Sequence, residues 1–353
     1  MSVAAALAVG VAIVLFLVRS RANYLRLPEL SSGGARATYS IAVVIPARNE
    51  EHNIERAVRS FRDNVIVVDD GSTDATSERA LAAGATVIQP PPLEPGMLGK
   101  PNACLAGAIS SESDWLLFVD ADTWYEPAFV PALISYAERN RLDMASVFLK
   151  QECLSVIESI LLPYAFALYF CGVHAESVNN SKSAEALANG QCMLFRRSAY
   201  RAIGGHAAVA SSVIEDVALA RVAKKHGLQT RVLRSEKLGH VRMYDSFWSI
   251  WRGFQKNSFR FLLVNPISGL QVIAASILLT SYLPVLAWLV VDKQWVAAGV
   301  FAVLPPIGLA PWYGKWSHAI LAPVAIYLFQ LIALNGMLTT LLGRKTDWKG
   351  RRV

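Results

Sequence analysis

The first 18 residues of the chain contain no charged side chain. At about 1.5 Å per residue they would form a helix of about 27 Å, long enough to cross the hydrocarbon core of a bilayer. Arg19, Arg21 and Arg26 follow this segment. A cleaved signal peptide normally carries its basic residues before the apolar run, so residues 1–26 are better interpreted as an uncleaved anchor. Because basic residues favour the cytoplasmic side, we expect the N-terminus outside and the following chain in the cytoplasm.

The C-terminal region, residues 266–353, is the second apolar zone. Residues 270–291 and 319–342 carry no charge and are long enough to span, whereas residues 295–311 are short and interrupted by three prolines. Three crossings in this region would put the basic tail outside, against the positive-inside rule, and two would keep it in the cytoplasm. We favour two crossings, which leaves one apolar segment re-entrant or interfacial.

The composition agrees with a chain that lies partly in a membrane. Hydrophobic residues make up 54% and charged residues 17% of the 353 positions, whereas soluble domains usually carry about 25% charged residues. The net charge of +7 suits an anionic lipid surface or a phosphate-bearing substrate. The four cysteines show no CxxC spacing, which argues against a zinc site or a disulfide framework.

Residues 40–260 are expected to form a cytoplasmic α/β domain. Short apolar runs alternate with stretches of helical period, and this alternation is typical of a mostly parallel sheet with helices on both faces. The expected strands are residues 41–46, 64–70, 85–89 and 115–120. Residues 153–173 and 244–262 are expected to be interfacial helices, since they are apolar or amphipathic segments within or next to this domain.

Acidic side chains stand where the expected strands end, which is where parallel sheets bind ligands. Asp120 and Asp122 follow a buried-type strand, and carboxylates are the ligands that hard divalent cations prefer. Asp69 and Asp70 end another strand and can hydrogen-bond a ligand such as a nucleoside. Lys100, near the start of an expected helix, would contact phosphate.

Glu215 and Asp216 precede an amphipathic helical stretch. An acidic pair is favourable at the positive end of a helix dipole, so a structural role accounts for it. The functional alternative is a general base, a carboxylate that removes a proton from an acceptor hydroxyl.

Residues 182–260 hold 14 Lys or Arg against five acidic residues. A basic stretch can indicate nucleic-acid binding. This one leads directly into an apolar segment and contains interleaved aromatic residues, so an element that faces anionic headgroups fits better, and no nucleic acid is expected as a partner.

Six motifs together resemble family 2 glycosyltransferases of the GT-A fold over about residues 40–260. They are VVIPARNEE (43–51), VVDDGSTD (67–74), GKPNA (99–103), FVDAD (118–122), NGQCMLFRRSAYRAIGGH (189–206) and IEDVALA (214–220). The apolar segments, with RMYDSF (242–247) and WKGR (348–351), look like membrane enzymes that glycosylate lipids. The carotenoid (diaponeurosporenoate) glycosyltransferases are the most similar, followed by hopanoid-associated and ceramide glucosyltransferases.

The resemblance implies an inverting transfer from a nucleotide-sugar donor, usually a UDP-sugar, to a lipid acceptor at the cytoplasmic membrane face, with Mg²⁺ or Mn²⁺ as cofactor. It implies Asp216 as catalytic base and Asp120 with Asp122 as metal ligands. The residues expected to bind the nucleotide sugar are Pro46, Ala47, Asn49, Glu50, Asp69, Asp70, Lys100, Asp120 and Arg242. His240 is a weaker metal candidate.

Three alternatives remain open at this point. The first is transfer of the sugar to a polyprenyl phosphate. The second is processive polysaccharide synthesis, although residues 255–258 do not continue as the Gln-x-x-Arg-Trp motif of the synthases. A membrane protein with a degenerate, non-catalytic site is the third alternative.

Overall fold

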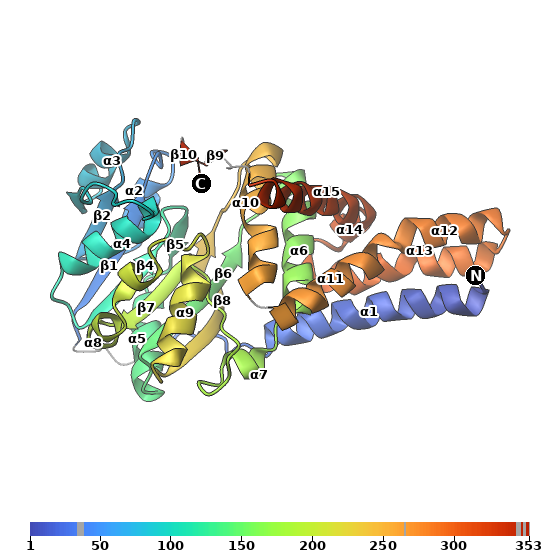
Figure 1. Cartoon of the computed structure of the whole chain (residues 1–353), viewed down its shortest axis with the longest axis horizontal. Helices are drawn as coiled ribbons and strands as arrows, with labels where there is room; N and C mark the ends of the chain where they lie inside the picture. Colours follow the sequence, from blue (N-terminus) through green and yellow to red (C-terminus); the bar gives the residue numbers. More distant parts are fainter. Residues whose placement is uncertain (34–38, 265, 344–346, 349–350, 353) are drawn as a thin grey trace. The chain divides into compact units, whose positions relative to one another are not determined.

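The structure is a computed structural model that describes residues 1–33, 39–264, 266–343, 347–348 and 351–352. The chain forms two compact units, each built from separate stretches of sequence. The α/β unit comprises Leu27–Glu152 and Glu176–Met243. The helical unit comprises Met1–Arg26, Cys153–Ala175 and Tyr244–Val353 (Figure 1).

An eight-stranded sheet is the centre of the α/β unit, with the strand order β3-β2-β1-β4-β7-β6-β8-β5. Strands β1 to β4 pair in parallel, and β6 pairs in parallel with β8. The β4–β7, β6–β7 and β5–β8 pairs are antiparallel. The strands are β1 (Ile41–Ala47), β2 (Val65–Asp69), β3 (Thr86–Ile88), β4 (Trp115–Val119), β5 (Thr123–Tyr125), β6 (Met144–Gln151), β7 (Cys192–Arg196) and β8 (Thr230–Val241).

Helices cover both faces of this sheet, because its central strands are apolar on both sides. All five residues of β2 and of β4 are buried. One core lies under α2 (Ile54–Arg59), α3 (Thr76–Ala82) and α5 (Phe129–Arg139). The opposite core lies under α4 (Gly99–Ile109), α8 (Arg197–Ala202), the 3₁₀ helix η1 (Gly205–Val209) and α9 (Glu215–Lys225).

The expectation of an α/β fold is confirmed, and the sheet is mixed. The four strands expected from the first 120 residues are present and parallel. Strand β7 then enters the sheet beside β4 in the opposite direction, with Leu117 opposite Leu194. Because β7 runs in this direction, the residues just before it, which follow residue 188, lie at the carboxyl end of β4, next to Asp120.

The helical unit contains the segments at both ends of the chain and the stretch around residues 153–175. Four described helical runs are long and apolar enough to cross a membrane: Val3–Leu25, Pro266–Val291, Trp295–Trp312 and Ala322–Leu341. The helices of this unit are α1 (Val3–Leu25), α6 (Val156–Cys171), α10 (Phe247–Val264), α11 (Pro266–Thr280), α12 (Tyr282–Val291), α13 (Trp295–Leu309), η2 (Ala310–Trp312), α14 (Trp316–Ala319) and α15 (Ala322–Leu341). Two short strands, β9 (Asp347–Trp348) and β10 (Arg351–Arg352), follow, and the sequence boundary between the units falls within the short α7 (Ala175–Val178).

The expected interruption by prolines within residues 295–311 is wrong, because α13 continues through Pro305 and Pro306. A proline lacks the backbone N–H that would bond the carbonyl four residues earlier. For Pro306 that carbonyl belongs to Ala302, and it accepts a hydrogen bond from the Tyr282 hydroxyl at 2.7 Å. A neighbouring helix therefore supplies the donor that the proline lacks.

Gly107 provides a test of the packing of α4 on the sheet. A Cβ at this position would overlap a Val44 methyl group and lie 3.0 Å from Val68 Cγ2. We expect Gly107→Val to destabilise the α/β unit by about 2 kcal/mol, since inserted methyl groups force shifts in a packed core. Thermal unfolding of the purified full-length protein in detergent measures the effect.

Ala82→Val is the matched control, since Ala82 is an exposed position of α3. It adds the same β-branched side chain to a helix without burying it. Equal melting temperatures for the two variants would contradict the close packing of α4.

Candidate functional site

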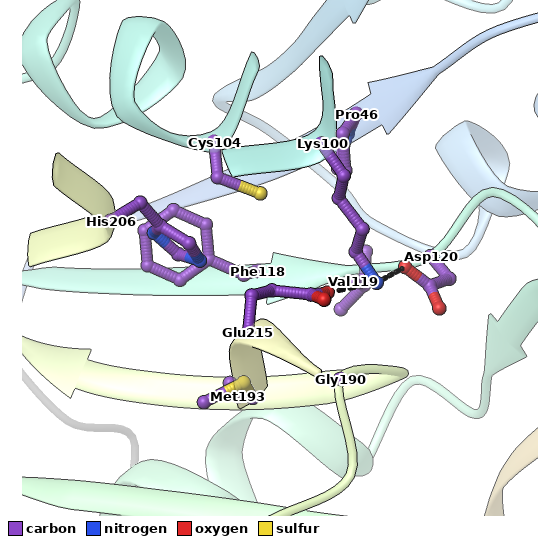
Figure 2. A pocket seen from close by; sticks show the side chains of 10 residues that line it. All are labelled: Pro46, Lys100, Cys104, Phe118, Val119, Asp120, Gly190, Met193, His206 and Glu215. Carbon is purple, nitrogen blue, oxygen red and sulfur yellow. Dashed lines mark ion pairs between the residues drawn. The ribbon is translucent and has the colours of Figure 1, made fainter. Parts of the chain in front are cut away.

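The candidate site lies at the carboxyl ends of β1 and β4, as the alternation of strands and helices predicts. Figure 2 shows a small cavity there, enclosed by side chains from α4, β4, η1 and the start of α9. Its polar lining consists of Lys100, Asp120, His206 and Glu215, and Pro46 at the end of β1 also faces it. The site residues implied by the sequence thus come from segments far apart in the chain.

Lys100 connects two of these segments through ion pairs. Its Nζ lies 2.7 Å from Asp120 Oδ1 and 3.0 Å from Glu215 Oε1 (Figure 2). Burial by itself lowers the pKa of a lysine, but the two carboxylates outweigh that effect and hold the pKa of Lys100 well above its usual value. The lysine is therefore a fixed positive charge between β4 and α9.

Asp216 lies beside this arrangement and is held by the backbone. Its Oδ2 accepts a hydrogen bond from the Gly190 N–H, and its Oδ1 accepts one from the Val217 N–H, both at 2.8 Å. Burial and the neighbouring Glu215 charge raise the pKa of Asp216 to about 7, although Lys100 opposes them. A carboxyl group with this pKa exchanges protons near neutral pH.

Three residues at the cavity were not predicted individually from the sequence. Glu215 was predicted only as part of an acidic pair, yet this side chain, 12% exposed, is the member of the pair that contacts Lys100. The other two are Gly190, whose N–H binds Asp216, and His206. The motif that contains Gly190 and His206 was the available signal, but spacing alone did not show which of its residues face the site.

His206 is a buried, neutral side chain. Burial lowers the pKa of its imidazole to about 4. The Tyr200 hydroxyl lies 2.7 Å from His206 Nδ1 and accepts a hydrogen bond from the His206 backbone N–H at 3.0 Å. These contacts fix the orientation of the ring at the wall of the cavity.

The residues expected to bind a nucleoside join two loops at the ends of β1 and β2. Asn49 has a positive φ of 53°, donates its N–H to Ser72 Oγ and accepts from the Thr73 N–H through Oδ1. Asp69 Oδ1 accepts from the Ser72 N–H at 2.8 Å. The loops are therefore held in one arrangement by side-chain to backbone hydrogen bonds.

The other expected nucleoside-binding residues lie in the last residues of β1 or in the loops that follow β1 and β2. Ala47 pairs with Asp69 across the β1–β2 ladder, and its carbonyl accepts from the Asp70 N–H. The Glu50 N–H donates to Thr76 Oγ1 at 2.8 Å. Pro46 is the member of the set that faces the cavity of Figure 2.

Asp122 and Arg242 meet at the start of the β5–β8 ladder. The Arg242 N–H donates to the Asp122 carbonyl at 3.2 Å. Burial and the charge of Arg242 lower the pKa of Arg56, whereas Asp122 acts in the opposite direction, so these three charged groups are neighbours. His240 Nδ1 instead lies 2.9 Å from Glu152 Oε1.

The donor set at the end of β4 fits a hard divalent cation in part. Within the described part of the chain, no group of three or more His, Cys, Asp or Glu side chains is arranged to hold a metal. Magnesium commonly takes only one or two protein carboxylates and completes its shell with water and substrate phosphate. Asp120 and Asp122, at this end of β4, remain the carboxylates expected to hold such a cation, and Asp120 Oδ1 is paired with Lys100.

The raised pKa of Asp216 leads to a test by pH. The folded protein holds this proton up to about pH 7, whereas an unfolded aspartate releases it near pH 4. Between these values the folded state binds more protons, so its stability falls as pH rises. We expect the melting temperature of the wild type, relative to Asp216→Asn, to fall between about pH 5 and pH 7 and then to level off.

Thermal unfolding of both proteins in detergent across this pH range measures the difference. The variant replaces a titrating group with one of the same shape. Parallel curves for the two proteins would show that Asp216 has an ordinary pKa.

Comparison with known proteins finds sequences similar to the segment that contains this site. Residues 42–204 match the model of glycosyl transferase family 2. The 4,4'-diaponeurosporenoate glycosyltransferase of Staphylococcus haemolyticus is 32% identical over 238 residues, and that of Staphylococcus aureus strain USA300 is 28% identical over 230 residues. The matches cover 62% of this chain and 61% and 60% of those proteins, so the chain spans about three fifths of their length.

A solved structure agrees with the fold. The mannosyltransferase PcManGT of Pyrobaculum calidifontis, in complex with GDP-Man and Mn²⁺, matches 97% of this chain and 99% of its own with a TM-score of 0.57. At 16% identity this likeness concerns the fold alone. The expectations of a GT-A-type fold and of a resemblance to family 2 glycosyltransferases are confirmed, the second by the match of residues 42–204 to the family model.

Proposed function

We propose that this protein transfers a sugar from a nucleotide-sugar donor to a lipid acceptor at the cytoplasmic face of a membrane. The observation that carries the proposal is the convergence of Asp120, Lys100, Glu215 and Asp216 at the carboxyl ends of the central strands. The family of the domain supports the reaction class. The name shared by the two staphylococcal relatives supports a carotenoid-type acceptor.

The proposed reaction is a single displacement with inversion at the anomeric carbon. With a hydroxyl acceptor, the acceptor oxygen forms a bond to that carbon while the bond to the diphosphate oxygen breaks, and the hydroxyl proton passes to the Asp216 carboxylate. The raised pKa of Asp216 suits this task, since a base works best when its pKa lies near the working pH. The two backbone N–H groups that bind Asp216 orient it for the transfer.

Lys100 and Asp120 would position the donor. Lys100 is placed to contact a phosphate oxygen once a donor competes with its carboxylate partners. A divalent cation held by Asp122 and Asp120 would offset the charge of the diphosphate leaving group. Glu215 keeps Lys100 in place through the 3.0 Å ion pair.

Asp216→Asn and Glu215→Gln form a matched pair of variants, since each neutralises one of two adjacent carboxylates. We expect Asp216→Asn to reduce transfer to a hydroxyl-bearing lipid by about 10²-fold or more, the usual contribution of a general base. Donor binding should be nearly unchanged. Glu215→Gln should mainly weaken donor binding, because it loosens Lys100.

The measurement is a screen of nucleotide sugars against a lipid extract in detergent, with glycolipid products identified by mass spectrometry. If Asp216→Asn keeps normal turnover and Glu215→Gln loses it, Glu215 is the general base and Asp216 is not. Absence of any glycolipid with every donor would remove the proposed function.

The helical unit leads to a proposal for membrane topology, which begins with α1 and α13. A Cβ at Gly10 would lie 2.5 Å from Leu304 Cδ1, so the two helices touch closely there. Further along both helices, the rings of Tyr24 and Trp312 lie 5.5 Å apart. The two helices therefore run side by side in the same direction (Figure 1).

The run formed by α11 and α12 lies against them in the opposite direction. Near its start, Gln271 Nε2 lies 3.4 Å from His174 Nε2, which in turn lies 2.8 Å from Arg19 of α1. Further on, the Tyr282 hydroxyl donates to the Ala302 carbonyl in α13, two residues from Leu304, which contacts Gly10. The loop after α12 thus lies towards the N-terminal end of α1.

Helix α15 covers only part of this three-run bundle. The Tyr327 hydroxyl, near its start, donates to the Thr280 carbonyl, which lies halfway along the α11–α12 run. Near its end, Thr339 accepts a hydrogen bond from Gln255 of α10 at 3.0 Å. We therefore infer that α1, the α11–α12 run and α13 cross the bilayer, that α15 is re-entrant, and that the basic tail is cytoplasmic.

Cysteine labelling of intact cells tests this topology. We expect a cysteine at Lys293, in the loop after α12, to react with a membrane-impermeant maleimide. A tag at the C-terminus should become accessible only after permeabilisation. A cysteine at the exposed Leu81 of the α/β unit is the cytoplasmic control, and a tag that is accessible without permeabilisation would require a fourth crossing.

A further inference from the structure

Arg56, in α2, is held in an unusual way for a surface arginine. Its guanidinium carbon lies 3.6 Å from the centroid of the Trp124 ring, so the cation covers the ring face. Among the described residues, no carboxylate forms an ion pair with Arg56. Its neighbour on the same helix, Arg59, is paired with Glu55 at 2.8 Å.

The stacked arrangement leaves the hydrogen-bonding edge of Arg56 available. A guanidinium that covers an aromatic ring uses its flat face, whereas its N–H donors lie in the plane and point outward. Trp124 is itself fixed, because His240 stacks against it with ring centroids 5.5 Å apart and an interplanar angle of 11°. His240 is in turn held by Glu152. Arg56 is therefore presented on a rigid support.

Arg242 adds a second guanidinium next to this one. Its backbone N–H is bonded to the Asp122 carbonyl, at the end of the ladder in which Trp124 pairs with His240. Burial and, after it, the charge of Arg242 lower the pKa of Arg56, whereas Asp122 opposes them, so the three groups lie near one another. Two arginines therefore lie near each other at this end of the β5–β8 ladder.

We propose that Arg56 and Arg242 form a binding site for an oxyanion of a substrate, a phosphate or a carboxylate group, with Trp124 as the support of Arg56. Arginine is the side chain best suited to such a group, because its planar fork matches two oxygens at once. Arg56 is not among the donor-binding and catalytic residues implied by the motifs, so its role would be an addition to that set. The proposal rests on the proposed function in assigning the oxyanion to a substrate of sugar transfer.

Two sources of the oxyanion are compatible with this chemistry. One is the diphosphate of the nucleotide-sugar donor, since Asp122 ends the same motif as Asp120. The other is an acidic end group of the lipid acceptor. Both would bind through the same in-plane N–H donors, so the experiment has one arm for each source.

The test compares Arg56→Met with Arg59→Met in the full-length protein in detergent. Both variants remove one positive charge from α2, and methionine keeps an apolar contact with Trp124. Calorimetry measures binding of UDP and GDP against uridine and guanosine, with Mg²⁺ present, as the donor arm. Binding of retinoate against retinol, an isoprenoid acid and its alcohol, is the acceptor arm. Melting temperatures within the error of the wild type confirm that both variants are folded.

We expect Arg56→Met to lose about tenfold or more in affinity for the anionic probe of one arm, and Arg59→Met to lose less than twofold. Loss for nucleoside diphosphates assigns the site to the donor, and loss for retinoate alone assigns it to the acceptor. If Arg56→Met behaves like Arg59→Met in both arms while the wild type transfers sugar, this inference is wrong and the proposed function stands. If Arg56→Met loses anion binding but the wild type transfers no sugar, the anion site is supported and the proposed function is wrong.

If Arg56→Met unfolds, Arg56→Lys replaces it. Lysine keeps the charge and the stem but removes the planar fork. Affinity for every anionic probe equal to that of the wild type would then overturn the proposal.

Discussion

The candidate site depends on the position of one lysine between two carboxylates. Lys100 stands in the first turn of α4, Asp120 ends β4 and Glu215 begins α9, and the ion pairs of 2.7 and 3.0 Å require all three element ends to meet. Removing charges from water is costly unless each one finds a partner. The lysine provides a partner for both acids, so the arrangement is stable before any substrate arrives.

The first half of the α/β unit could be predicted from the sequence because its pattern is local. Continuous apolar runs such as Trp115–Val119 form fully buried strands, and the parallel pairing of β1, β2, β3 and β4 follows from the helices between them. The same logic brings Asp120 to the edge of the sheet where ligands bind, close to Lys100. These inferences needed only the period of the pattern and the order of the elements.

The second half depends on contacts that the sequence pattern does not contain. Strand β7 runs antiparallel beside β4, a pairing between residues almost 80 positions apart, and nothing local specifies it. The choice between Glu215 and Asp216 is set by which carboxylate meets Lys100 and which meets the Gly190 N–H. The continuity of α13 through its prolines likewise depends on Tyr282, a residue of another helix.

The interrupted order of the two units has a consequence for isolating the α/β part. Helix α6 belongs to the helical unit, yet it is inserted in sequence between the two stretches of the α/β unit. Its Tyr164 and Phe170 are fully buried, and its backbone carbonyls accept hydrogen bonds from Ser20 and Asn23 of α1. A fragment trimmed at both ends of the chain would still contain this helix without its partners, with a large apolar surface exposed to water. A water-soluble version of the domain therefore requires a short linker in place of residues 153–175, besides removal of the terminal helices.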